Sequence, residues 1–365
     1  MYRRQRAADV AKTLLHNASH RLLTIDPTDQ RGIVDALDQS LDWSLDSAAG
    51  GAGSRDFEPS FAEPSANHLA FQVSPGGVLS SPDDRKEIST GVMKNLVGQY
   101  FGPSALRWLQ SRIEPMQARH SRYGKGMGSM FSLGMDRSGL SEAAVSYEWG
   151  PDVADSLPAP VFELARTAME NLPGLTPFYS TIRCGRNSGG QQVSFEIDRA
   201  LPLADLEPLM RALGIGHRHG GLVSLTSFIL GARFTLPPKT SVLTLLNSRN
   251  GVELRFDINL DALPDTPAQL LPLLRLPMTE RPKNLQALDR LVTALTPEGY
   301  YGPGNVSVLS IRVRNDLPAR VALYLRPIAF QPGEPSSNGA ENGVTAQQPA
   351  TTLPPGEMSP AQMPV

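Results

Sequence analysis

The stretch VSFEIDRALPLADLEPLMRALG, residues 193–214, begins as an alternating strand, passes through a Leu-Pro pair and continues as a helix. Val193 and Phe195 alternate with polar residues, which predicts a strand with one dry face and one wet face. The same order of strand, Leu-Pro and helix recurs from Val145 and again from Val252. The chain therefore repeats one structural unit.

Each of these strands follows another strand, so the unit is predicted to be a hairpin followed by a helix. Turn residues are found at 138–139, 187–190 and 315–316, where Gly, Asn and Asp favour tight connections. A further pair is predicted from 222–236 and 241–251 into 252–260, and the first pair from 56–62 and 68–74. Five hairpins give ten strands.

The segments between the hairpins have the spacing of helices with one apolar face. In the first of them, Val161, Leu164, Ala165 and Ala168 follow the helical period, and proline suits the first turn because it lacks an N–H. If helices cover the dry faces, the wet faces line a lumen. We therefore predict an α+β fold, an antiparallel β-barrel of about ten strands built from repeated β-β-α units with helices outside, because closure removes exposed edges.

Composition limits the class of protein. With 365 residues and 40% hydrophobic content the chain can bury a large core. The formal net charge of −2 without a basic stripe disfavours nucleic acid, and no apolar run reaches the length of a membrane span. Cys184 is the single cysteine, and the start lacks the apolar core of a signal peptide. Both features predict a cytoplasmic protein.

Three regions are expected along the chain. Residues 1–50 are predicted to be a helical N-terminal extension and linker, because apolar residues recur every four positions from Val10 to Leu22 and a Gly-rich joint follows. The barrel is predicted over residues 56–327. Residues 331–365 are rich in Pro, Gly, Ser and Gln, a composition that predicts a disordered tail.

Four stretches together resemble the barrel prenyltransferases, the ABBA or PT-barrel fold, and in particular the cyanobactin peptide prenyltransferases. They are FEPSFAEPSANHLAFQV at 57–73, SLGMDRSGLSEAAVSYEW at 132–149, LVSLTSFILGARF with NGVELRFDINL at 222–234 and 250–260, and RVALYLRP at 320–327. The resemblance implies transfer of an isoprenoid from an allylic diphosphate to an aromatic, peptide or amino-acid acceptor. No cofactor is expected to be required, with Mg²⁺ as an optional aid, because no carboxylate cluster in the sequence demands a metal.

The resemblance also implies site residues. In that family a carboxylate near the start of the barrel orients the nucleophile, and basic residues with tyrosines hold the diphosphate, whose growing negative charge they stabilise. Glu58 matches the carboxylate, and Tyr324 and Arg326 match the closing strand. Several basic positions of the family are neutral or acidic in this chain: Gln72, Ser146, Glu148, Ser194, Glu196 and Ala322.

Other cations are candidates for the same role. Arg183, Arg255 and Arg312 lie on the polar faces of their strands, so we expect Arg183, Arg255, Tyr324 and Arg326 to contact the diphosphate. The alternative is that these arginines are exposed or ion-paired. Glu148 and Glu196 also leave two roles open: salt bridges to those arginines inside a polar barrel, or recognition of a cationic or hydrogen-bond-donating substrate.

No metal site is expected. GHRHGG at 216–221 has two histidines without a third ligand nearby, which favours a turn. The motifs of zincins, α/β-hydrolases and Asp-rich terpenoid synthases are absent from the sequence. Two hypotheses remain: a prenyltransferase, or a non-catalytic barrel, as a binding protein or pseudoenzyme, that holds a ligand without a diphosphate.

Overall fold

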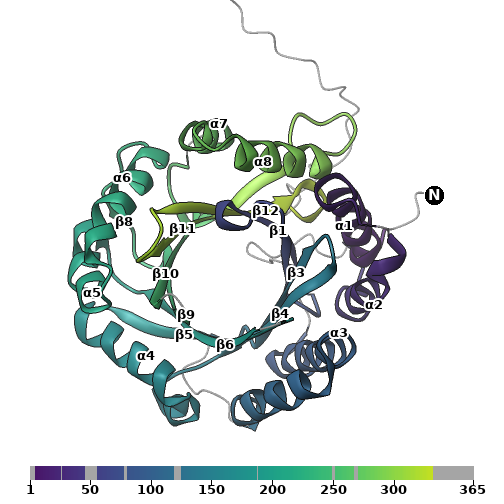
Figure 1. Cartoon of the computed structure of the whole chain (residues 1–365), viewed down its shortest axis with the longest axis horizontal. Coiled ribbons are helices and arrows are strands. Elements are labelled where there is room, and N and C mark those ends of the chain that lie inside the picture. Colours follow the sequence, from purple (N-terminus) through teal and green to yellow (C-terminus); the bar gives the residue numbers. More distant parts are fainter. Residues whose placement is uncertain are drawn as a thin grey trace, which may run out of the picture. The chain divides into compact units, whose positions relative to one another are not determined.

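The computed structural model describes residues 5–25, 27–45, 56–77, 80–118, 125–186, 188–248, 251–266 and 270–331. Ten strands of this part of the chain close into an antiparallel barrel in the order β1-β12-β11-β10-β9-β6-β5-β4-β3-β2. Figure 1 looks into the barrel and shows the helices around its outside. The predicted ten-stranded barrel with outer helices is confirmed.

The strands form five consecutive hairpins and one small accessory pair, β7 with β8. Their bounds are β1 Phe57–Ala62, β2 Leu69–Val73, β3 Ser129–Asp136, β4 Gly139–Glu148, β5 Leu175–Gly185, β6 Ser188–Ile197, β7 Leu201–Pro202, β8 Thr235–Leu236, β9 Ser241–Ser248, β10 Gly251–Asn259, β11 Gly304–Arg314 and β12 Arg320–Pro327.

The helices connect one hairpin to the next or precede the barrel. Their bounds are α1 Ala7–Leu23, α2 Arg31–Ser40, α3 Pro82–Ala118, α4 Ala159–Asn171, α5 Leu206–Ala212, α6 His219–Ile229, α7 Leu270–Arg275 and α8 Pro282–Leu295, with short 3₁₀ turns at η1 Pro27–Gln30, η3 Glu63–Ser65, η4 Pro151–Ser156, η5 Leu203–Asp205, η6 Gly216–Arg218, η7 Leu260–Ala262, η8 Leu276–Met278 and η9 Ile328–Phe330. α3 is interrupted at Gly102, where φ is 85°. It is therefore two helices in sequence.

The outward faces of the strands form the core. Val145, Tyr147, Val193 and Phe195 are each 0% exposed, and α3 and α4 pack against the strands that carry them. Burial of a side chain of this size contributes about 1.5–3 kcal/mol. A one-residue slip of a strand would place polar residues under the helices, so the register is firmly set and the polar faces point inward, as predicted.

One predicted strand is a helix. Residues 222–236 were expected to pair with the next strand, but His219–Ile229 is α6 and only Thr235–Leu236 extends as β8. The β-branched and aromatic residues of this stretch favour a strand. Its buried residues Leu222, Thr226 and Ile229 instead follow a helical spacing, and packing against β11 selects the helix.

The N-terminal helices pack on the barrel domain: α1 contacts α2, α8 and β2. The Gly-rich joint at 46–55 and the chain from 332 onward lie outside the described residues, so the linker and the disordered tail remain predictions. Within the described part of the chain, no helix has both the length and the apolar character needed to cross a membrane.

The topology gives the barrel two different ends. All five hairpin turns lie at one end, here called the hairpin end, because the paired strands alternate in direction. The connections through helices lie at the other end, here called the helix end. The lumen between them contains the candidate site.

Candidate functional site

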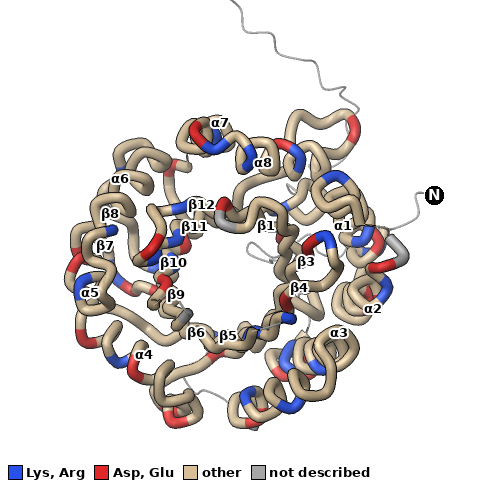
Figure 2. The backbone as a smooth tube through the Cα atoms, viewed as in Figure 1, with Lys and Arg blue, Asp and Glu red and all other residues tan. Residues whose placement is uncertain are grey.

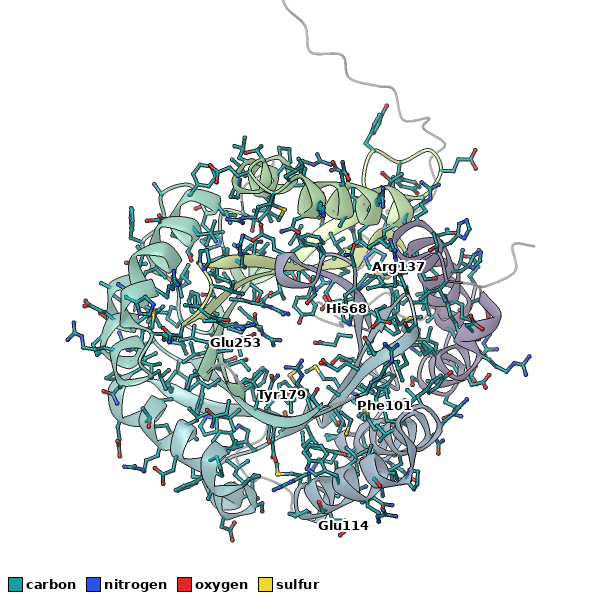
Figure 3. All side chains as sticks on the ribbon, viewed as in Figure 1. His68, Phe101, Glu114, Arg137, Tyr179 and Glu253 are labelled. Atoms are coloured by element: carbon teal, nitrogen blue, oxygen red, sulfur yellow. The ribbon has the colours of Figure 1, made fainter. Side chains whose placement is uncertain are left out.

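A cavity of about 180 Å³ occupies the lumen. One wall, from β1 to β4, carries small residues: Ser60, Ala62, Ala70, Ser132, Gly134 and Ala144. The rest of the wall, on β5 and on β10 to β12, carries charged and aromatic groups: Arg183, Glu253, Arg255, Arg312 and Tyr324. Figure 3 labels His68, Tyr179 and Glu253 around the opening of the barrel. The small side chains leave space beside β1 to β4, and most of the charged side chains of the cavity lie on the other strands.

Arg183 is paired inside this cavity. Its Nε donates to Glu142 Oε1 at 3.1 Å, and its Nη2 donates to the second carboxylate oxygen. Burial opposes ionisation of Glu142, but the charge and hydrogen bonds of Arg183 lower the pKa of that carboxyl below its ordinary value. The two groups form a charged pair at neutral pH. Glu142 therefore already balances most of the positive charge that Arg183 could offer to a ligand.

Arg255 is also paired. Its Nε donates to Asp257 Oδ2 at 2.9 Å. Burial works against its charge, but Asp257 and Tyr324 raise the pKa of Arg255 above the ordinary value for arginine. Arg255 therefore stays charged beside Tyr324, with one carboxylate in contact.

Arg312 is the third arginine that strand alternation places on a polar face. It lines the same cavity as Arg183 and Arg255. Its Nε is buried and has no hydrogen-bond partner among the described residues. Arg312 lies directly opposite Arg255 in the pairing of β10 with β11. Alternation along one strand does not predict which residues of two strands lie opposite each other.

Glu58 and Arg326 lie apart from the cavity. Both are buried, and Arg326 Nη2 is 3.6 Å from Glu58 Oε1. The same guanidinium donates to Asp261 at 2.7 Å. Glu58 is in register with Gln72, and both residues lie toward the helix end of their strands. The predicted group is therefore divided: Arg183, Arg255 and Tyr324 line the cavity, whereas Glu58 and Arg326 lie toward the helix end.

Glu148 and Glu196 are engaged within the protein. The backbone N–H groups of Lys125 and Met127 donate to Glu148 Oε1 at 3.0 and 2.9 Å. The Lys125 ammonium pairs with Glu196 and lies 5.2 Å from the ring centre of Phe178. The partner of these acids is thus the segment before β3, and not the cavity arginines that the sequence suggested.

His68 is a cavity residue that the sequence analysis missed. Its Nε2 lies 2.9 Å from Ser141 Oγ. Burial lowers the pKa of His68, although Glu142 acts in the opposite direction. The imidazole is neutral at pH 7, so it offers a hydrogen bond and no charge. Its position directly before the strand β2 was the only sequence signal.

The described residues contain no group of three or more His, Cys, Asp or Glu side chains arranged to hold a metal ion. No Mg²⁺ ligands are therefore assigned among these residues.

A closed ring of ten antiparallel strands, a polar lumen and helices on the outside define the class of the fold: the chain has the ABBA or PT-barrel fold, which solved prenyltransferases share. One solved structure of this fold is the 6-dimethylallyltryptophan synthase from Micromonospora olivasterospora in complex with DMASPP and Trp, with 14% identity, coverage of 91% of this chain and 100% of that chain, and a TM-score of 0.71.

Two further structures agree. The 5-dimethylallyltryptophan synthase from Streptomyces coelicolor has 14% identity over 93% of this chain and 100% of that one, with a TM-score of 0.68. The prenyltransferase PriB in its apo form has 13% identity over 89% and 97%, with a TM-score of 0.67. No protein-family model and no curated protein matches the sequence. The likeness is one of fold.

Proposed function

We propose that the protein transfers an isoprenoid from an allylic diphosphate to an aromatic, peptide or amino-acid acceptor. The observation that supports this most directly is that Arg183, Arg255 and Arg312 line one lumenal cavity together with Tyr324. The structures that share the fold include PriB with its product diphosphate and a dimethylallyltryptophan synthase with DMASPP and Trp. The same ligand classes are proposed for this chain.

The chemistry suits such a cavity. The allylic C–O bond breaks and its electron pair leaves with the diphosphate, while the acceptor forms a bond to the allyl carbon and loses a proton. Guanidinium groups and a phenol stabilise the negative charge on the leaving diphosphate. Arg255 and Arg312 supply the charge beside Tyr324, and Arg183 contributes hydrogen-bond donors on the adjoining wall.

Glu58 is proposed to orient the acceptor or to take its proton. Arg326, 3.6 Å away, is a positioning residue for this carboxylate. The small residues Ala62, Ala70 and Ala144 leave room for the apolar isoprenoid beside the arginines of the cavity. On this arrangement the donor and acceptor meet within the barrel, away from water.

A second function is favoured by one observation. Arg183 and Arg255 already have carboxylates in contact, Glu142 and Asp257, which reduces the positive charge available to a diphosphate. A non-catalytic barrel that binds an uncharged or mixed-charge ligand would be suited by such paired groups. The two functions differ in whether the lumen prefers a diphosphate to the matching alcohol.

Calorimetric titration with dimethylallyl diphosphate and with dimethylallyl alcohol decides between them. We expect the diphosphate to bind more tightly, and Arg255→Ala to weaken its binding about tenfold or more, because charge-assisted hydrogen bonds contribute about 1.5–3 kcal/mol. Arg166→Ala, on the exposed face of α4, is the control. Prenylated tryptophan or tyrosine peptide is then sought by mass spectrometry, with Mg²⁺ or with EDTA. Equal binding of diphosphate and alcohol, or no binding of either, contradicts the transferase.

A further inference from the structure

His68 is a titratable residue of the lumenal cavity to which the transfer reaction has so far assigned no role. It is the one histidine among the described residues that line this cavity, beside Arg255 and Tyr324, and Figure 3 shows it within the ring of strands. Histidine is the side chain whose ordinary pKa, about 6.5, lies closest to neutral pH. A histidine in a reaction cavity is therefore a candidate for proton transfer.

The backbone of β3 leaves space for the imidazole at a glycine. A Cβ on Gly134 would lie 2.4 Å from both Cε1 and Nε2 of His68, well below the separation of about 3.5 Å at which carbon atoms make normal contact. The ring therefore lies directly against the backbone at Gly134. Any larger residue there would displace the ring, so the glycine is required for this close approach.

A β-bulge brings a hydroxyl group to the ring. Gly134 pairs with Glu142, but the next residue of β3, Met135, pairs with Leu140, so Ser141 is an extra residue of β4 without a partner on β3. Bulges of this kind redirect side chains and are common beside active sites. Ser141 Oγ lies 2.9 Å from Nε2 of His68. This hydrogen bond fixes the orientation of the imidazole.

The other ring nitrogen has no partner within the protein. In the part of the chain that the structure describes, Ser141 is the one side chain that hydrogen-bonds to the imidazole, and it does so at Nε2. When Nε2 carries the proton and donates it to Ser141 Oγ, Nδ1 presents a lone pair. A base whose second nitrogen is held by an orienting group is the arrangement that general-base sites use.

The surroundings of His68 favour its neutral form. Burial lowers the pKa of His68, against the effect of Glu142 on β4 and Asp136 on β3. Arg312 on β11 and Arg183 on β5 add to the lowering, and Figure 2 shows basic positions along β10, β11 and β12 on one side of the ring. The other titratable or charged residues that line the cavity are Glu253, Arg255 and Tyr324. At neutral pH the imidazole is therefore free to accept a proton, and once protonated it releases that proton readily.

We propose that His68 takes the proton that the acceptor loses during prenyl transfer, and that Ser141 positions its ring. This rests on the proposed transfer reaction and divides two roles: Glu58 orients the acceptor, and His68 removes the proton. Glu58 lies apart from the cavity beside Arg326, whereas His68 lines it. The acceptor forms a bond to the allyl carbon, the C–O electron pair leaves with the diphosphate, and the proton passes from the acceptor to Nδ1.

The test compares single-turnover prenylation of tryptophan or a tyrosine peptide by the wild type and by His68→Gln, at several pH values from about 5.5 to 8. Glutamine keeps a donor for Ser141 but cannot take a proton. The variant should form product about a hundredfold or more slowly, while its affinity for dimethylallyl diphosphate stays that of the wild type. The wild-type rate should fall as His68 is protonated below about pH 6.5, and the variant should lack this fall.

Three further variants separate the base from other roles. His217→Gln is the matched control, because His217 is exposed on η6 and does not line the lumenal cavity; its rate and pH profile should equal those of the wild type. Glu58→Gln should slow the reaction but keep the fall below about pH 6.5, since the imidazole is intact. Gly134→Ala, which displaces the ring of His68 without removing it, should slow the reaction as well.

A measurement on the wild type tests the base without a substitution. Long-range ¹H–¹⁵N correlation spectra show which ring nitrogen carries the proton, and the signals of His68 are those missing from His68→Gln. At about pH 7.5 we expect a proton on Nε2 and none on Nδ1. A proton on Nδ1 overturns the assignment, because the lone pair would then face Ser141 and not the acceptor.

The base and the transfer reaction fail in distinguishable ways. If His68→Gln prenylates the acceptor at the wild-type rate and with the wild-type pH profile, His68 is not the base and the transferase stands. If His68→Gln is slow because it no longer binds dimethylallyl diphosphate, the imidazole serves the donor and the base is again wrong. If the wild type prenylates no acceptor under any condition, the transferase is wrong and the base falls with it.

Discussion

Glu58 on β1 and Arg326 on β12 join the first and last strands of the barrel, with 3.6 Å between Oε1 and Nη2. The strands pair directly, with Ser60 opposite Tyr324. The carboxylate proposed to face the acceptor therefore lies at the closure of the ring, and its position depends on the last residues of the fold.

Arg326→Ala should destabilise the protein more than Asp261→Ala. Arg326 and Glu58 are both buried, and removal of one partner from a buried pair costs about 3–5 kcal/mol because the other charge remains. Asp261 is 40% exposed, and Glu58 stays beside Arg326 when Asp261 is lost, so this loss should cost less than that of Arg326. Chemical denaturation measures both. Equal free energies of unfolding for the two variants would contradict a stabilising role for the buried pair.

The free energy of unfolding should fall as pH drops below 6.5, the ordinary pKa of histidine. Burial lowers the pKa of His68, with Arg312 and Arg183 acting in the same direction and Glu142 and Asp136 opposing. The folded state then binds fewer protons than the unfolded state in this range, so stability present above pH 6.5 is lost as the pH falls toward the lowered value.

His68→Gln is the variant that isolates this dependence. Denaturation at about pH 7.5 and at about pH 5.5, where carboxylates are still largely ionised, should show a smaller loss of stability in the variant than in the wild type. Parallel losses in both proteins would assign the pH dependence to other groups.

Cys184 should react very slowly with thiol reagents while the protein is folded. Burial, together with the charge of Glu142, raises the pKa of the thiol to about 12, and the thiolate is the reactive form. Reaction with dithionitrobenzoate at about pH 8 should be at least about a hundredfold slower than in guanidinium chloride. Rapid stoichiometric labelling of the native protein would show that β5 opens readily.

Gly128→Ala should destabilise the segment that holds Glu148. Gly128 has φ of +74°, and a Cβ there would lie 2.3 Å from the carbonyl oxygen of Pro82. The backbone must move, and Met127, whose N–H donates to Glu148, is the preceding residue. We expect a loss of more than about 1 kcal/mol, the usual cost of the backbone conformation alone.

Gly126→Ala is the matched control for this substitution. Gly126 has φ of +75°, yet a Cβ there would meet no atom within 4 Å. It carries the conformational cost without the clash, so thermal unfolding should rank the wild type above Gly126→Ala and Gly126→Ala above Gly128→Ala. The reverse order of the two variants would contradict the close approach to Pro82.

The barrel could be predicted from the sequence because alternation is a local signal. Alternation places Val193 and Phe195 on the same face of their strand without any knowledge of the neighbouring strands. Ten strands that each have one apolar face can form only a few kinds of sheet. α6 was predicted wrongly because strand-favouring residues such as Val223 and Phe228 lie on a helix selected by packing. Secondary structure follows local pattern only where tertiary contacts agree with it.

The site was less predictable because it depends on register and on distant contacts. Arg320 faces Arg312 across a turn of residues 315–319, so the pair follows only when the length of that turn is known. The contact of Lys125 with Glu196 joins positions 71 residues apart. Alternation assigns a residue to the lumen, but only strand pairing shows which residues meet there.

The unbroken ring of strands has a mechanical consequence. Every barrel strand has a hydrogen-bonded neighbour on both sides. The lumen therefore cannot widen unless all backbone hydrogen bonds between two neighbouring strands are broken. Ligands must pass along the axis, and a bulkier ligand is admitted only by trimming side chains. Substitutions that change ligand preference are therefore expected at the small residues of β1 to β4. The backbone of the barrel, and with it the diameter of the lumen, should stay the same.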